Sequence, residues 1–252
     1  ALAPPDLSLK EALSGLNFWL QFFIEFVLAG CAFVICNNLA QMVRALGPPE
    51  SEAEASGDRP AGMSAAPLVS LFSIFNCGGR LVVALVSESA ARRGFARSLP
   101  FSVACALMAV AHMCVMAHHR SALALGCACA GLAYGALAAV NPVVVSVLFG
   151  TKAFASIYTA VMVAGGLGSM GLSSALAAGN YERATAPGET VCTGPACFRS
   201  TSAICSAISL AGLAASCALA SRETAAKRIR RRRSMSTINV FAHTDRDSQA
   251  SE

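Results

Sequence analysis

The residues best suited to chemistry in this sequence are a few charged side chains inside long apolar runs. Glu25 lies among phenylalanines in the first run, and Arg80 is the one arginine within the second. An ionisable group at membrane depth indicates a functional site by default, because an unpaired charge is costly there. Glu25 could therefore carry a proton, or it could face a polar gap or a basic partner. Arg80 could bind an anion or pair with Glu88.

Amide and hydroxyl groups form a second set of candidates within the same runs. Asn76 and Arg80, for example, lie four residues apart and so share one face of a helix. Polar groups of this kind either line a cavity that binds a solute or hold neighbouring helices together. Pro142 removes a backbone donor and can bend its helix beside a cavity. The cavity candidates are Asn38, Gln41, Asn76, Tyr134, Asn141 and Ser146.

Histidine and cysteine give little indication of metal chemistry. His118 and His119 are adjacent but have no third ligand at a suitable spacing, so no metal site is expected. His112 is expected to be a packed, hydrogen-bonded side chain. Nine of the 11 cysteines lie in apolar runs, where cysteine acts as a small hydrophobic residue. Cys192 and Cys197 lie in a polar loop, where they form either a local disulfide or two free thiols.

No pattern typical of an enzyme or a cofactor site is present. The sequence has no phosphate-binding glycine loop, no Cys-x-x-Cys pair and no serine–histidine elbow. The net charge of +5 comes largely from residues 227–233, so it does not indicate a nucleic-acid partner. We therefore predict neither an enzymatic activity nor a cofactor.

The elements that must position these groups are membrane-spanning helices. Of the 252 residues, 55% are hydrophobic and only 13% are charged, whereas soluble domains carry about 25% charged residues. A span needs about 20 mainly apolar residues. The sequence predicts an all-α, polytopic bundle of six transmembrane helices in contact with membrane lipids. The predicted spans are residues 17–41, 67–87, 100–117, 122–149, 154–178 and 201–220.

The loops between these spans predict the orientation of the bundle. Basic residues concentrate in the loops of one side, which the positive-inside rule places in the cytoplasm together with both chain ends. We expect a cytoplasmic segment at residues 1–13, the bundle at 14–222 and a basic, disordered cytoplasmic tail at 223–252. Within the bundle, residues 131–173 predict two closely packed helices, because small residues allow close contact and the connecting turn is short.

Four short blocks of glycine, polar and aromatic residues interrupt the apolar runs. They are NFWLQFF from residue 17 with NNLAQ from residue 37, FNCGGR from residue 75 with Ser87 and Glu88, GLAYG from residue 131 with LFGTK from residue 148, and CFR from residue 197. In this order they resemble the second six-helix half of nodulin-like major facilitator transporters, over about residues 9–222. Because the chain begins at Ala1 rather than Met, we expect it to be part of a longer protein.

This resemblance implies a secondary transporter that moves a small solute, such as an organic anion or another metabolite, by alternating access. It also implies an N-terminal six-helix half as the partner of this chain. Residues 78–93 resemble the superfamily's glycine, acid and arginine loop, which locks the cytoplasmic side in one state. The alternative is a non-transporting multi-pass scaffold or receptor-like protein. The gating or coupling candidates are Glu25, Arg80, Glu88, Arg92 and Arg93.

Overall fold

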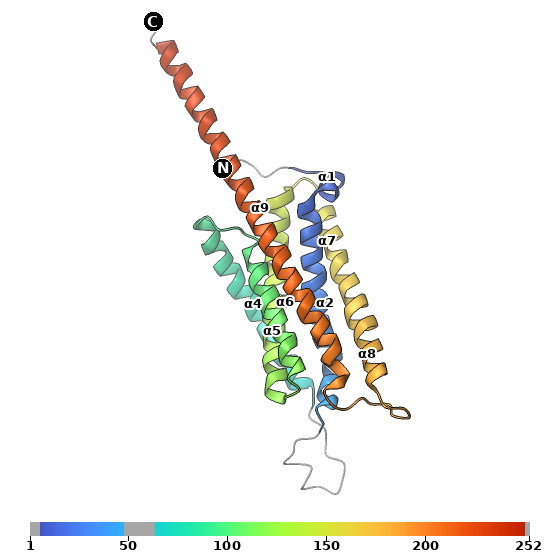
Figure 1. Cartoon of the computed structure of the whole chain (residues 1–252). Helices are drawn as coiled ribbons and strands as arrows, with labels where there is room; N and C mark the ends of the chain where they lie inside the picture. Colours follow the sequence, from blue (N-terminus) through green and yellow to red (C-terminus); the bar gives the residue numbers. More distant parts are fainter. Residues whose placement is uncertain (1–5, 48–63, 250–252) are drawn as a thin grey trace.

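The protein folds as a bundle of long helices (Figure 1), and no strand occurs in the described part of the chain. The computed structural model describes residues 6–47 and 64–249, with side chains as far as residue 229. The elements are α1 (Leu9–Ser14), α2 (Leu16–Ala45), α4 (Ala66–Arg92), α5 (Leu99–Met116), α6 (Arg120–Phe149), α7 (Phe154–Gly168), the π-helical η1 (Ser169–Leu176), α8 (Ala177–Ala184) and α9 (Ala196–Gln249).

Six helices among the described residues are long and apolar enough to cross a membrane, which confirms the predicted fold class. The fifth of them, Phe154–Ala184, combines α7, η1 and α8. Most of the helices extend a few residues beyond the ranges expected from hydropathy. The largest difference is at the C-terminus, where α9 continues beyond the predicted span to Gln249. Alanine, lysine and arginine follow the last span, and all three favour helix.

The ends of the helices follow the breakers in the sequence. Pro67 and Pro100 lie in the first turns of α4 and α5, where the missing N–H of proline costs no helical bond. Gly150 ends α6 with a φ of 88°, a conformation that glycine adopts without steric cost. The turn after it is short, so α7 begins only a few residues after the end of α6, as predicted.

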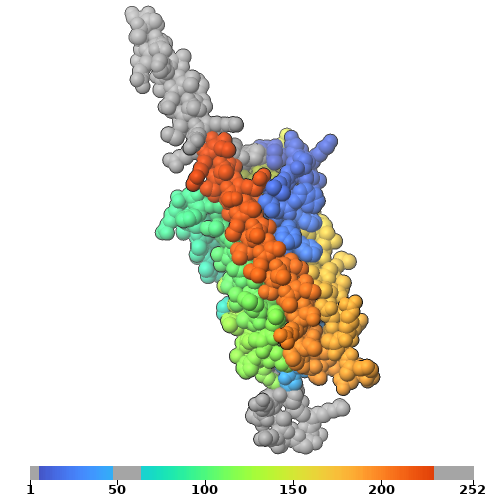
Figure 2. Space-filling view, in the orientation of Figure 1, coloured from blue at the N-terminus to red at the C-terminus, as the bar shows by residue number. Residues whose placement is uncertain are grey.

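Helix α2 is the centre of the bundle. It packs against α6, α7, η1 and α9, and it carries the longest set of buried side chains. Helix α9 crosses the front of the molecule, with α5 beside it and α8 on its other side near the lower end (Figure 2). Helix α4 packs mainly on α6 and leaves much of its apolar surface open. Its large exposed apolar side chains are Val69, Ile74, Phe75, Leu81, Val82, Leu85 and Val86.

The closest helix contacts occur at glycines. The sequence predicted such contacts between α6 and α7, but they occur between other helices. Helices α6 and α7 touch each other little. Instead, Gly131 and Gly135 of α6 face the backbone of α4, and Gly168 of α7 faces Gly30 of α2. A Cβ atom on Gly30 would lie 2.9 Å from the Cα of Gly168. The small residues of 131–173 therefore serve contacts with α4 and α2.

The N-terminal segment is attached to the turn between α6 and α7. The Asp6 carboxylate accepts hydrogen bonds from the backbone N–H groups of Thr151 and Lys152 at 3.1 and 3.3 Å. Ser8 and Glu11 form a capping box at the start of α1, and the Ser8 hydrogen bonds lower the pKa of Glu11. These contacts place the N-terminal segment and Lys152 at the same end of the bundle (Figure 1).

Replacing Gly168 with alanine should destabilise the protein by about 1–3 kcal/mol, because the added methyl group overlaps the Phe26 carbonyl. Gly166→Ala is the matched control, since nothing lies within 4 Å of its added Cβ and the change from glycine favours the helix by up to ~1 kcal/mol. Thermal unfolding of the purified full-length protein measures both. Equal melting temperatures for the two variants would show that the contact between α2 and α7 is not tight.

Candidate functional site

The main candidate site is a buried polar cluster between α2, α6 and α7. The Asn141 Nδ2 donates to the Glu25 Oε2 at 2.8 Å, and the Gln21 Nε2 donates to the Asn141 Oδ1 at 2.5 Å. Only 2% of Glu25 is exposed, and Gln21 and Asn141 are equally inaccessible. Asn141 thus links an amide and a carboxyl group of α2 across the interface between two helices.

Local sequence explains how these groups meet. Gln21 and Glu25 are one turn apart in α2 and share a face. Asn141 immediately precedes Pro142, the proline inside α6. On the α7 side, a Cβ atom at Gly165 would lie 3.0 Å from the Glu25 Oε1, so glycine leaves the space that the carboxyl group fills. The Met162 Sδ closes the cluster at 3.6 Å from the Asn141 Nδ2.

The chemistry of this cluster is that of a buried acid without a counter-charge. None of the ion pairs in the described part of the chain involves Glu25. Apolar surroundings favour the neutral acid, whereas the amide N–H of Asn141 and any contact with water favour the carboxylate. The charge of this carboxyl group therefore depends on its access to water. Within the described residues the Gln21 Oε1 has no hydrogen-bond partner, so one acceptor in the cluster remains open.

A second polar cluster lies further along α2, against the π-helical segment η1. The Ser173 hydroxyl donates to the Phe33 carbonyl at 3.0 Å and accepts from the Nδ2 atoms of Asn37 and Asn38 at 3.2 and 3.4 Å. Asn38 also donates to the Val34 carbonyl of its own helix. π-Helical turns are frequent at functional sites. The rise of an α-helix places this cluster about 18 Å from Glu25 along α2.

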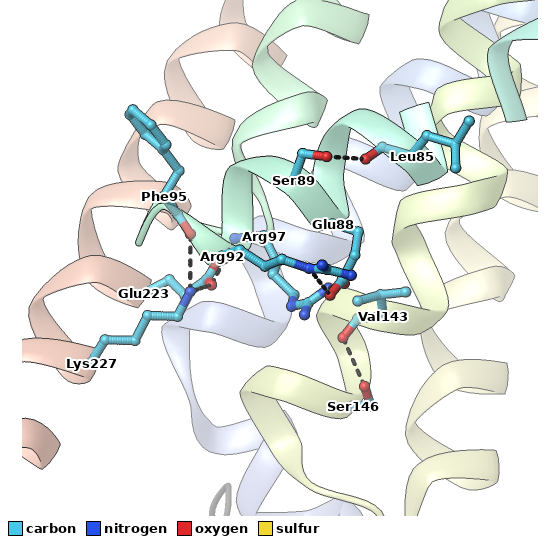
Figure 3. Close-up of polar contacts among 10 residues, drawn as sticks. All are labelled: Leu85, Glu88, Ser89, Arg92, Phe95, Arg97, Val143, Ser146, Glu223 and Lys227. Atoms are coloured by element: carbon cyan, nitrogen blue, oxygen red, sulfur yellow. Dashed lines mark hydrogen bonds and ion pairs between the residues drawn. The ribbon is translucent and has the colours of Figure 1, made fainter. Parts of the chain in front are cut away.

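The structure disperses the other predicted cavity residues. Gln41 is exposed on α2, and Asn76 accepts from the Arg80 Nε at 3.3 Å on the exposed side of α4. The Tyr134 ring packs on Phe33 and Phe72. The Ser146 hydroxyl donates to the Val143 carbonyl of its own helix (Figure 3). Of the six candidates, only Asn141 joins Glu25.

Two of the predicted gating residues, Glu88 and Arg92, form an ion-pair cluster with Arg97 at one end of the bundle (Figure 3). Glu88 pairs with Arg97 at 2.9 Å and with Arg92 at 3.4 Å. It does not pair with Arg80, which lies two turns, or about 12 Å, back along α4. The expected pair between Arg80 and Glu88 was therefore wrong. Arg93 instead lines an exposed groove of about 780 Å³ with residues of α9.

Glu223 is the residue of this end that the sequence analysis did not select. Although only 3% exposed, it accepts from the backbone N–H groups of Arg97 and Ser98 at 2.8 and 3.0 Å and from the Ser98 hydroxyl at 2.7 Å. It also pairs with Lys227 at 2.7 Å (Figure 3). Its carboxylate thus caps α5 and ties α9 to the loop after α4. The spacing of Glu223 and Lys227, four residues apart, was the available signal.

The opposite end of the bundle is held by hydrogen bonds and a disulfide among the described residues. Cys192, in the loop before α9, forms a disulfide with Cys197 in the first turn of α9. In the same loop, the Gly194 N–H donates to the Ala45 carbonyl at the end of α2 at 2.9 Å. The Arg120 guanidinium donates to the Gly47 carbonyl. Arg120 and the loop around Gly194 therefore converge on the C-terminal end of α2.

Comparison with known families decides the assignment that the fold alone leaves open. A family model described as NFD4, C-terminal domain, matches residues 5–227, which include all six candidate spans almost completely. The chain belongs to the NFD4 C-terminal domain family. No curated protein matches it. The family membership agrees with the nodulin-like resemblance of the four sequence blocks. The matched residues include both polar clusters and the ion-pair cluster.

We predict that Asn141→Leu destabilises the protein by about 1–3 kcal/mol. An interhelical hydrogen bond in a membrane contributes only about 0.6 kcal/mol on average, but this change leaves a carboxyl and an amide group without partners. Ser146→Ala is the control on the same helix, because its hydroxyl bonds only within α6. Thermal unfolding of the full-length NFD4-family protein gives both values, and a loss no larger in Asn141→Leu than in Ser146→Ala contradicts the prediction.

Glu223→Ala should likewise destabilise the protein by about 1–3 kcal/mol, because three donors at the start of α5 lose their acceptor. Glu88→Ala removes an exposed carboxylate and should be less destabilising than Glu223→Ala, because solvent screens its ion pairs. The two variants are compared by thermal unfolding at low and high salt. If Glu88→Ala proves the more destabilising, the cap on α5 is not the main contact at this end.

Proposed function

We propose that this chain is the C-terminal half of a major-facilitator-type secondary transporter that moves a small solute by alternating access. The observation that carries the proposal is the buried Glu25, held by Asn141 without a counter-charge at the centre of a six-helix bundle. A bundle that served only as a scaffold has no need of an acid at this depth, where ionisable groups are costly. Membership in the NFD4 C-terminal domain family supports the same conclusion.

The open apolar surface of the bundle supports a partner half. Helix α4 exposes Ile74, Leu81 and Leu85 on the side away from α6. Helix α7 likewise exposes apolar residues away from α2, among them Val163 and Leu167. In a transporter made of two six-helix halves, the second half packs against such faces and encloses a central site. We assign the partner as an N-terminal six-helix half of the same protein, and lipid as the occupant of the remaining surface.

The proposed cycle assigns a role to each cluster. In the described conformation Glu25 is buried. Rocking of one half against the other would expose α2 and α7 to water and change whether Glu25 is protonated. At the end that carries Lys152, Arg97 and Lys227, the contacts of Glu88 and Glu223 would hold one state closed. The positive-inside rule makes this end cytoplasmic. Arg80, which is exposed on α4, is positioned to meet a small organic anion from the open side.

The decisive experiment is uptake by the full-length protein in proteoliposomes, with a panel of organic anions and other metabolites across a pH series. We expect uptake of at least one solute to depend on pH, and Glu25→Gln to abolish that dependence because the amide cannot titrate. Glu182→Gln, at an exposed position of α8, is the control and should leave it intact. A Glu25→Gln protein that keeps the pH profile of the original excludes Glu25 as the coupling group.

The alternative is a non-transporting scaffold or receptor-like protein, and one observation favours it. The amides of the second cluster, Asn37 and Asn38, are occupied by Ser173 and so can serve as contacts between helices. The sequence that precedes Ala1 in the gene discriminates the two functions. Six further spans there support the transporter, whereas a start codon directly before Ala1 supports the scaffold.

A further inference from the structure

A cluster of three metal-binding side chains lies in the core, apart from the polar clusters described above. Cys31 of α2, His112 of α5 and Cys205 of α9 each offer a ligand atom, and these atoms lie within 4.8 Å of one another. All three side chains are completely buried. They come from three helices that pack together where α9 crosses α5 and α2 (Figure 1).

The hydrogen bonds of His112 favour a ligand role over simple packing. Its Nε2 lies 3.2 Å from the Cys31 carbonyl, which fixes the proton on that nitrogen. Nδ1 then carries a lone pair, and it has no hydrogen-bond partner among the described residues. A histidine that binds a metal usually donates its other ring N–H to a carbonyl in this way. A merely packed histidine would leave a buried acceptor unsatisfied, which is unfavourable in an apolar core.

We propose that Cys31, His112 and Cys205 bind one thiophilic metal ion, Zn²⁺ or Cu⁺. Two sulfur atoms and one imidazole nitrogen form a donor set that suits these ions and not Mg²⁺ or Ca²⁺. Binding removes a proton from each thiol, so two thiolates and a neutral imidazole leave a Zn²⁺ site without net charge in the apolar core. The Ser209 hydroxyl, one turn further along α9, donates to the Cys205 carbonyl at 2.8 Å and lies 3.8 Å from the Cys31 sulfur.

The site would join α2, α5 and α9 at a point that the proposed solute pathway does not include. Cys31 lies six residues after Glu25, or about 9 Å along α2. Each ligand lies in a different span, so no local spacing of residues in the sequence could indicate the site. This explains why neither His112 nor the cysteines were expected to bind metal.

Elemental analysis of the purified full-length protein tests the proposal. We expect about one equivalent of zinc or copper per chain to be lost in Cys31→Ser and in Cys205→Ser, relative to the unmodified protein. Cys105→Ser and Cys127→Ser are matched controls, because they remove buried free cysteines outside the cluster, and they should retain the metal. X-ray absorption identifies the ion and should show sulfur at about 2.3 Å and nitrogen at about 2.0 Å for zinc.

A chelator provides a readout that does not depend on how well the ligand variants fold. Stripping the metal should lower the melting temperature of the unmodified protein and of Cys105→Ser, and its replacement by Zn²⁺ or Cu⁺ should restore it. Absence of both metals from the unmodified protein, or their retention in both ligand variants, overturns the proposal. A disulfide between Cys31 and Cys205 in the purified protein, detected by mass spectrometry, overturns it as well.

Discussion

The structure depends on the close packing of α2 against the helices around it. In a membrane, lipid covers apolar surface as well as protein does, so helices associate through close contact and hydrogen bonds. Gly30 and Gly168 allow α2 and α7 to meet backbone to backbone. That approach fixes the separation of the two helices, and therefore the space beside Gly165 in which the Glu25 carboxyl group lies.

The central position of α2 also explains why the polar residues gather on it. Every polar group inside a bilayer must find a partner within the protein, and α2 has neighbours on nearly all sides. Gln21 and Glu25 find Asn141 on α6, whereas Asn37 and Asn38 find Ser173 on η1. The peripheral α4 has fewer neighbours, and within the described part of the chain its Arg80 hydrogen-bonds to Asn76 of the same helix. Burial of polar groups thus follows the number of neighbours around each helix.

The sequence predicted the helices and two members of the site, Glu25 and Asn141, but not their pairing, and this limit has a physical cause. Run length and the low charge content predict the spans because a bilayer has a fixed thickness. Glu25 stands out because a single acid in an apolar run is costly. Its partner Asn141 was a candidate, but the sequence did not predict that the two side chains meet. The face of α6 that meets α2 depends on how Gly131 and Gly135 of α6 pack against α4, which is distant in the sequence. Glu223 was missed because a polar residue after a span is usually interpreted as part of a tail. Its contact with the start of α5 exists only in the folded structure.

The two ends of the bundle are held by different kinds of contact, and this difference bears on how the bundle could move. At the end with Glu88 and Glu223, ion pairs and a charged helix cap join α4, α5 and α9. Such contacts can break when water enters and form again afterwards, as a reversible closure requires. At the other end, the disulfide between Cys192 and Cys197 closes a short loop within one connection. It shapes that loop without joining two spans, so the contacts between spans at this end are hydrogen bonds, such as that from the Gly194 N–H to the Ala45 carbonyl.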